Sequence, residues 1–244
     1  MIGSKKVMRY GLMALSVAGG AAAGALTGLA LWVSPVLALD SPLLTQPGSA
    51  EQAPIVQEPV QQAAATAPQA VIERFHGVLL SAMQQAESLG VTGRAKMLDG
   101  PVRETFDFPR IAQLTAGRSW RSGSADEKQR LSDAFAQLSV ATYASRMKGF
   151  SGQSFETAGV DDGPRGTRMV MTQLLSPGRD TIDLTYVLAK RKSGEWRVID
   201  VLMQGTISEL SVRKSEYGGV LSSGGLDGLS AALINKAEGL AGGL

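Results

Sequence analysis

Apolar residues recur with helical spacing at the start of the region expected to fold. Between residues 70 and 89 they fall every three or four positions, so they share one face of a helix. These positions are Val71, Ile72, Phe75, Val78, Leu79, Ala82, Met83 and Ala86. The pattern predicts an amphipathic helix over residues 70–89.

Two further helices are indicated by their start signals. Asp107 directly before Phe-Pro is a typical helix start, and the helix that follows is expected to stop at Gly117. Ser124 and Glu127 have the spacing of a capping box, which predicts a longer helix that ends at Gly149.

The hydrophobic pattern then changes to that of strands. Four segments rich in Val, Ile, Thr, Tyr and Trp are predicted strands, at residues 153–162, 167–175, 181–190 and 195–204. Ser193-Gly194 separates the last two and predicts a hairpin. Helical spacing returns at 209–221 and 226–240, on either side of a Ser-Ser-Gly-Gly break. The order of elements predicts an α+β fold, with a curved four-stranded antiparallel sheet packed by N- and C-terminal helices.

One face of this sheet is expected to be strongly apolar. In the third strand, the apolar set Ile182, Leu184, Tyr186 and Leu188 alternates with Thr181, Asp183, Thr185 and Val187. In the fourth strand, Val198, Asp200 and Leu202 alternate with Ile199, Val201 and Met203. An apolar face under several helices suits either a filled core or a cavity for a flexible apolar ligand, and both alternatives stay open.

The first 38 residues have the layout of an export signal. Lys5, Lys6 and Arg9 precede a long uncharged apolar run that ends in Val-Leu-Ala, with small residues suited to cleavage after Ala38. An uncleaved membrane anchor is the alternative, because about 20 apolar residues can span a bilayer. Either reading places the rest of the chain outside the cytoplasm, and we expect it in the periplasm.

Residues 39–69 are expected to form a disordered tether. Half of the ten prolines of the chain lie here among Gln, Ala and Ser, without a periodic apolar face. The folded domain is therefore predicted at 70–240, followed by a flexible tail at 241–244.

Composition excludes several classes of function. The chain has no cysteine and a single histidine, His76, which argues against thiolate chemistry, a histidine-containing triad and multi-histidine metal sites. We expect His76 at the surface or at the boundary of the core, and no cofactor or metal. Beyond residue 38 there are 24 − 3 = 21 basic and 22 acidic residues, so the body has a net charge of −1. Such a body does not favour nucleic acid as a partner.

An ordered set of short motifs resembles a known family. The set consists of Phe106-Asp107-Phe108, Ile111-Ala112, Gly117, Trp120, Phe135, Thr142-Tyr143, Gly149-Phe150-Ser151-Gly152-Gln153, Trp196, Asp200-Val201, Gly205-Thr206-Ile207-Ser208, Arg213, Tyr217 and Gly224-Gly225-Leu226-Asp227-Gly228-Leu229. In this order the motifs resemble the periplasmic MlaC family, also called the toluene-tolerance auxiliary proteins. Phe150-Ser151-Gly152-Gln153 and Leu221-Ser222-Ser223-Gly224-Gly225 resemble most closely its hopanoid-associated HpnM branch.

The resemblance implies a lipid carrier and not an enzyme. Its fold would be MlaC/NTF2-like, with an apolar cavity between sheet and helices that holds a hopanoid or a phospholipid. Its partners would be an inner-membrane ABC transporter complex and an outer-membrane lipoprotein complex, or a hopanoid exporter. By position in the family pattern and by shared strand faces, the lipid-binding residues would be Tyr143, Ile182, Leu184, Val201, Met203 and Ile207.

Two other classes of function stay open on the sequence. Helices on a curved antiparallel sheet also occur in small isomerases and dehydratases, where Tyr143, Tyr186, Asp183 and Asp200 could supply acid–base groups. A membrane-anchored adaptor without lipid cargo is the other alternative. The chain has no GxxxxGK[ST] phosphate loop, so a carrier of this kind would depend on an energised partner.

Overall fold

The computed structural model describes residues 67–242, which form helices packed on one antiparallel sheet. The helices are α2 (Pro68–Gln84), α3 (Ala86–Thr105), α4 (Phe108–Ala116), α5 (Arg118–Ser122), α6 (Ala125–Arg146), the 3₁₀ turn η2 (Pro164–Gly166) and α7 (Glu209–Ala241). The strands are β1 (Ser154–Asp162), β2 (Arg168–Leu175), β3 (Ile182–Lys190), β4 (Trp196–Met203) and β5 (Ile207–Ser208). The predicted α+β class is therefore confirmed.

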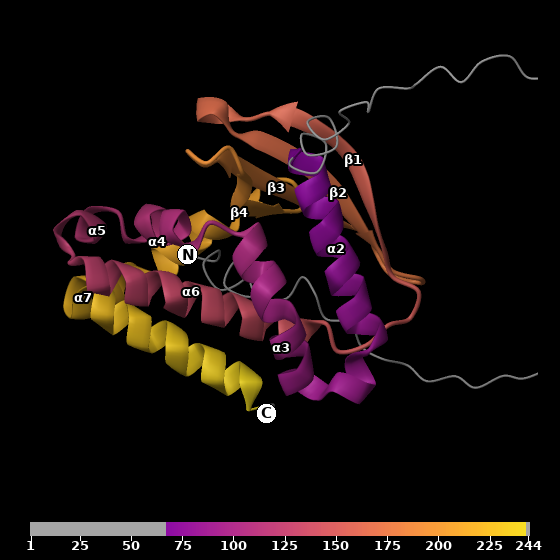
Figure 1. The fold of residues 1–244 in the computed structure, drawn as a ribbon, viewed down its shortest axis with the longest axis horizontal. Coiled ribbons are helices and arrows are strands. Elements are labelled where there is room, and N and C mark those ends of the chain that lie inside the picture. The colour runs from indigo at the N-terminus through magenta and orange to yellow at the C-terminus, as the bar shows by residue number, and fades with distance from the viewer. Residues whose placement is uncertain (1–66, 243–244) are drawn as a thin grey trace, which may run out of the picture.

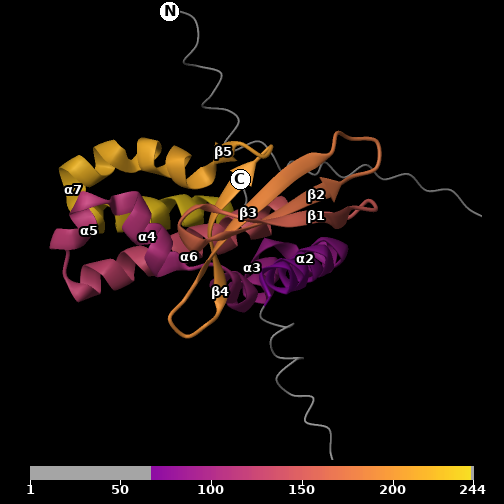
Figure 2. The same ribbon diagram turned by 90° about the horizontal axis from the view of Figure 1, so that it is seen from above.

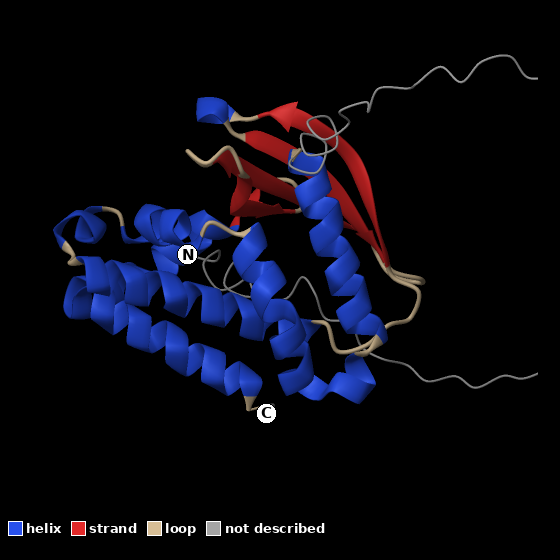
Figure 3. Ribbon diagram, in the orientation of Figure 1, coloured by secondary structure: helices blue, strands red, loops and turns tan. Residues whose placement is uncertain are grey.

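The helices cover the sheet in two groups. Figure 1 shows α2 running across the strands, whereas α6 and α7 lie side by side beyond them. Figure 2 places α2 and α3 on one side of the strands, and Figure 3 separates the helical and strand parts by colour. Buried side chains from both groups and from the sheet form one hydrophobic core.

The sheet is a meander in which each strand pairs with the next. Its order in the described residues is β1-β2-β3-β4-β5, all antiparallel, and the predicted hairpin at Ser193-Gly194 joins β3 to β4. The prediction of four strands is corrected to five, since Leu202 and Met203 pair with Ser208 and Ile207 in β5. A two-residue strand has no alternation of its own that sequence could reveal.

A β-bulge in β4 overturns the predicted face of Val198. Val187 pairs with Asp200 and Leu188 with Val198, so Ile199 is an extra residue without an opposite partner. Because the bulge interrupts the alternation, Val198 lies buried with the face that carries Val201 and is not on the opposite side.

The first predicted helix is shorter than expected, and a helix follows it that the sequence pattern did not indicate. α2 ends at Gln84, and α3 continues for 20 residues with Gly90 and Pro101 inside it. The buried guanidinium of Arg94 helps to hold α3, because Nε donates to Ala144 O (2.8 Å) and Nη1 to Ala86 O (2.7 Å).

The predicted caps of α4 and α6 are confirmed. The carboxylate of Asp107 accepts a hydrogen bond from Arg110 N, and Ser124 and Glu127 form the reciprocal capping box. The α6 helix ends at Arg146, three residues before the predicted stop at Gly149.

The predicted break in the C-terminal helical region is also confirmed. Gly225 has φ 62° and ψ −154°, which splits α7 into two arms. Lys236 Nζ on the second arm contacts Glu216 Oε1 on the first at 2.9 Å, so the arms lie side by side.

The predicted N-terminal segments fall largely outside this structure. The leader at 1–38 and all but the last residues of the predicted tether lie beyond residues 67–242, as does the end of the predicted tail. Among the described helices, none has the length and hydropathy that crossing a membrane requires.

Candidate functional site

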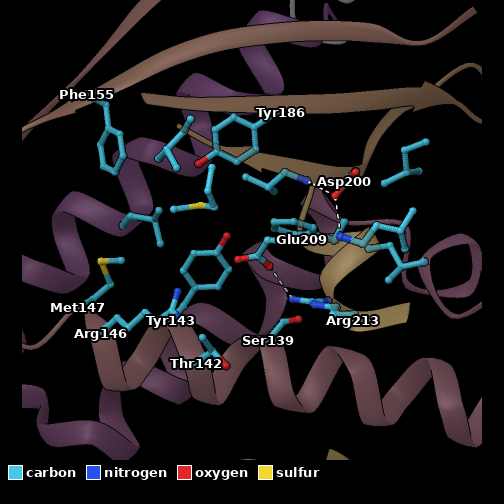
Figure 4. A pocket seen from close by; sticks show the side chains of 18 residues that line it. Ser139, Thr142, Tyr143, Arg146, Met147, Phe155, Tyr186, Asp200, Glu209 and Arg213 are labelled. Carbon is cyan, nitrogen blue, oxygen red and sulfur yellow. Dashed lines mark hydrogen bonds and ion pairs between the residues drawn. The ribbon is translucent and has the colours of Figure 1, made fainter. Parts of the chain in front are cut away.

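A pocket lies between the apolar face of the sheet and the helices α6 and α7. It has a volume of about 60 Å³. Its sheet wall is formed by Leu184 and Tyr186 of β3 and by Val201 and Met203 of β4, which pair directly across the two strands. Figure 4 shows Tyr143 of α6 projecting into the space opposite Tyr186.

The structure brings together four of the six predicted lipid-binding residues. Tyr143, Leu184, Val201 and Met203 line the pocket, whereas Ile182 and Ile207 are not among its lining residues. Ile182 is the first residue of β3 and packs partly buried against the core, and Ile207 is 39% exposed in the edge strand β5. Contact of all six with a lipid stays a prediction.

Several lining residues were not among those predicted from the sequence to bind lipid. They are Leu79, Phe106, Ile111, Ser139, Thr142, Arg146, Met147, Phe155, Ile199, Glu209, Leu210 and Arg213. Leu79 and Met147 stand at apolar helical positions, but helical spacing identifies a buried face without showing which part of it borders a cavity. The remaining ones come from segments far apart in sequence that meet only in the fold.

The expectation for His76 is wrong, because this residue is buried behind the pocket wall. Only 4% of it is exposed, its ring stacks on Phe155 at 3.9 Å, and its Nε2 lies 3.1 Å from the hydroxyl of Tyr186. Burial lowers the pKa of His76 from 6.5 to about 4. Little in the sequence indicated that His76 is buried, because its position next to Phe75 lies off the single apolar face that helical spacing predicts. The helix α2 buries both neighbouring positions.

The buried His76 makes stability depend on pH. Above pH 6.5 the imidazole is neutral in both states, but between pH 6.5 and 4 the unfolded chain binds a proton that the folded protein excludes. Stability therefore falls with falling pH, and we expect a loss of about 2 kcal/mol between pH 7 and pH 5. Urea unfolding of the wild type and of His76→Gln at both pH values measures this. An equal loss in the variant would assign the pH dependence to other groups.

The candidate acid–base residues do not meet at one point. The carboxylate of Asp200 accepts hydrogen bonds from Val201 N, Leu210 N and Ser208 Oγ, so it ties β5 and the start of α7 to β4. Asp183 is exposed, pairs with Gln173 and is not a lining residue. Among residues 67–242 no group of three or more histidine, cysteine or acidic side chains could hold a metal ion.

The two tyrosines of the pocket are strongly held in the protonated form. Burial raises the pKa of Tyr186, with a smaller contribution from Tyr143, and burial likewise raises that of Tyr143. The charge of Glu209 raises the pKa of Tyr143 further, whereas Arg146 and Arg213 oppose it. Both hydroxyls therefore remain hydrogen-bond donors at neutral pH.

Comparison with known families decides the family of this chain. The family described as MlaC protein matches residues 73–235, which is more than half of the chain. The chain belongs to the MlaC family. The match covers α2 through most of α7 and includes every element around the pocket.

One solved protein structure has a fold similar to that of the described domain. It is the phospholipid-binding protein from Ralstonia solanacearum in complex with a phospholipid, with 22% identity and a TM-score of 0.61. The similarity covers 71% of this chain and 98% of that chain, and at this identity it supports the fold. The MlaC match is to the family as a whole, so the narrower resemblance to the HpnM branch and the relation to NTF2-like folds stay predictions.

Proposed function

We propose that this MlaC-family protein is a carrier that binds a membrane lipid and moves it between the inner and outer membranes. The observation that carries the proposal is the apolar pocket in which Leu184, Val201 and Met203 of the sheet face Tyr143 of α6. The Ralstonia protein of similar fold, which is named as phospholipid-binding, supports the same function.

The energetics of lipid transfer explain why an apolar pocket is needed. Moving a sixteen-carbon chain from a bilayer into water costs about 12 kcal/mol, at about 0.8 kcal/mol per CH₂. A pocket walled by strands β3 and β4 replaces most of the lost contact, so transfer becomes nearly balanced. Net direction then has to come from an energised partner.

Loading requires the pocket to enlarge. Its volume of about 60 Å³ is well below the roughly 300–1,000 Å³ of ordinary ligand pockets. The sheet wall is held by the antiparallel pairing of β3 with β4, whereas the opposite wall consists mainly of side chains from α6 and from the start of α7. We therefore infer that helices and sheet move apart when acyl chains enter.

The proposed setting is the periplasm. The basic residues, apolar run and Val-Leu-Ala end of the first 38 residues support export, with cleavage after Ala38 or retention as an inner-membrane anchor. The proposed partners are an inner-membrane ABC transporter complex and an outer-membrane lipoprotein complex, or a hopanoid exporter. The proposed cargo is a phospholipid or a hopanoid.

The pocket favours a carrier over an acid–base enzyme. Asp200 is engaged by three donors of β4, β5 and α7, and Asp183 is exposed and is not a lining residue. Neither aspartate is therefore free to exchange protons with Tyr143 or Tyr186, and Glu209, which also lines the pocket, is held in an ion pair with Arg213. Turnover of a lipid by the pure protein would reverse this conclusion.

Native mass spectrometry of the full chain, purified gently from its own cells, tests the proposal. We expect near one lipid per chain, with a mass that separates a hopanoid from a phospholipid, and a mature N-terminus at Leu39. A folded protein without lipid, also after incubation with phospholipid vesicles, would overturn the carrier and favour the adaptor.

A further inference from the structure

A second pocket lies between α2, the end of α3 and the hairpin that joins β3 to β4. Its volume is about 530 Å³, within the range of ordinary ligand sites, and it shares no lining residue with the pocket at Tyr143. Its apolar lining residues are Val71, Phe75, Val78, Pro101 and Trp196. We call it the α2 groove. The function proposed above does not use this groove.

The walls of the α2 groove are fixed to one another by hydrogen bonds and an ion pair. Asp107 N, just after α3, donates to Val198 O of β4 at 2.9 Å, and the Asp107 carboxylate pairs with Arg191 of the hairpin at 3.0 Å. Arg197 Nη1 donates to Arg103 O in the last turn of α3 at 3.1 Å. The groove is therefore formed before anything binds in it, which lowers the cost of binding.

The hairpin side of the α2 groove is positively charged. Residues 190–197 include four basic side chains and one acidic side chain. Lys190 is exposed, and its Nζ lies 5.8 Å from the centre of the Trp196 ring. The charged lining residues outside the hairpin, Arg74 and Glu104, are one of each sign. The groove thus suits an apolar ligand that carries negative charge.

The chain directly before α2 has this complementary character. Residues 39–66 contain three acidic residues and no basic one. Within them, residues 54–60 read Pro-Ile-Val-Gln-Glu-Pro-Val, which places apolar side chains and Glu58 between or beside two prolines. Proline-rich segments suit aromatic-lined grooves, because their extended backbone loses little conformational entropy on binding.

The segment 54–60 is close enough in sequence to reach the groove. Residues 61–67 separate it from the start of α2 at Pro68, and seven extended residues span up to about 23 Å. Val78, the lining residue of α2 farthest from Pro68, is about 15 Å along the helix. A segment on so short a connection has an effective concentration of order mM, so a few weak contacts suffice to hold it.

We propose that residues 54–60 bind in the α2 groove of the same chain. Ile55 and Val56 would pack against Trp196, and Glu58 would face the basic side of the hairpin. Binding leaves residues 39–53 as the free part of the tether, so it shortens the reach of the domain from any membrane to which the leader anchors it. The proposal does not depend on lipid binding, and its failure would leave the carrier function untouched.

Disulfide trapping in the full chain tests the proposal, because the chain has no cysteine of its own. The pair Gln57→Cys and Val78→Cys is compared with the pair Gln57→Cys and Gly77→Cys. Gly77 is the matched control: it is exposed, does not line the groove, and a Cβ there meets no atom within 4 Å. We expect the disulfide within one chain to form at least tenfold faster with Val78→Cys. Equal rates in the two pairs, or disulfides that form only between two chains, would overturn the proposal.

A charge reversal in the tether tests the assigned contacts without altering the folded domain. In the Gln57→Cys and Val78→Cys chain, Glu58→Lys is expected to slow disulfide formation about threefold. Glu51→Lys makes the same change of charge outside the bound segment and should leave the rate unchanged. An equal effect of the two lysine substitutions would overturn the placement of Glu58 at the hairpin.

Discussion

Replacing Leu210 by lysine is expected to lower lipid affinity at least tenfold while the domain remains folded. Leu210 lines the pocket at the start of α7 and packs against the core, but its side chain is only partly buried. In the lipid-free protein the lysine can extend its ammonium to water, so we expect a loss of about 1–2 kcal/mol in stability. With lipid bound, the acyl chains would exclude that water, and the charge would oppose binding by about 1.4 kcal/mol or more.

Val212→Lys provides the control for this experiment. Val212 is 37% exposed, lies two residues further along the same helix and is not a lining residue. Both variants add the same charge to the same segment, so a difference between them reports on the pocket. Vesicle-loaded protein analysed by native mass spectrometry gives the bound fraction. If folded Leu210→Lys retained lipid as well as Val212→Lys does, the lipid would have to bind elsewhere.

Replacing Arg94 by methionine is expected to lower the free energy of unfolding by about 3 kcal/mol. Arg94 is 6% exposed, and its guanidinium donates to the carbonyls of Ala86 and Ala144. Methionine fills a similar volume but leaves both buried carbonyls without these donors. Because Ala86 begins α3 and Ala144 is near the end of α6, the loss would loosen the contact between the two helices.

Chemical denaturation of three variants checks this prediction. Arg94→Lys keeps one positive charge with a different donor geometry, and we expect it to lose about half as much as Arg94→Met. Arg121→Met replaces an exposed arginine of α5 and should change stability by no more than about 0.5 kcal/mol. A loss in Arg94→Met as small as in Arg121→Met would contradict the assigned role of the buried guanidinium.

Most of the secondary structure was predictable because its determinants are local. The carboxylate of Asp107 and the pair Ser124–Glu127 act within three residues of the helix starts that they define. Gly194, with φ 95°, marks the turn between β3 and β4. The α3 helix was missed because Gly90 and Pro101 weaken its local pattern, and because Arg94 joins it to Ala144 of α6, fifty positions away.

The site was predictable only in part. Alternation along β3 correctly predicted the apolar face that carries Leu184, and four predicted lipid-binding residues do share one pocket. The bulge at Ile199 could not be read from the residue pattern, because one additional residue reverses the face of all positions before it. Arg146 and His76 were not recognised as parts of the pocket or its wall, since their surroundings come from other elements.

By itself, the sequence determined the order of helices and strands apart from α3, α5 and β5, the caps and turns that bound most of them, the absence of thiolate chemistry and the family. These depend on residue type and on spacing over a few positions. Only the tertiary structure decided which face of β4 is buried, that His76 lies beneath Tyr186, and that Arg146 and Arg213 stand at the same pocket. The reason is that burial, pKa and charge balance depend on atoms that are brought together from distant parts of the chain.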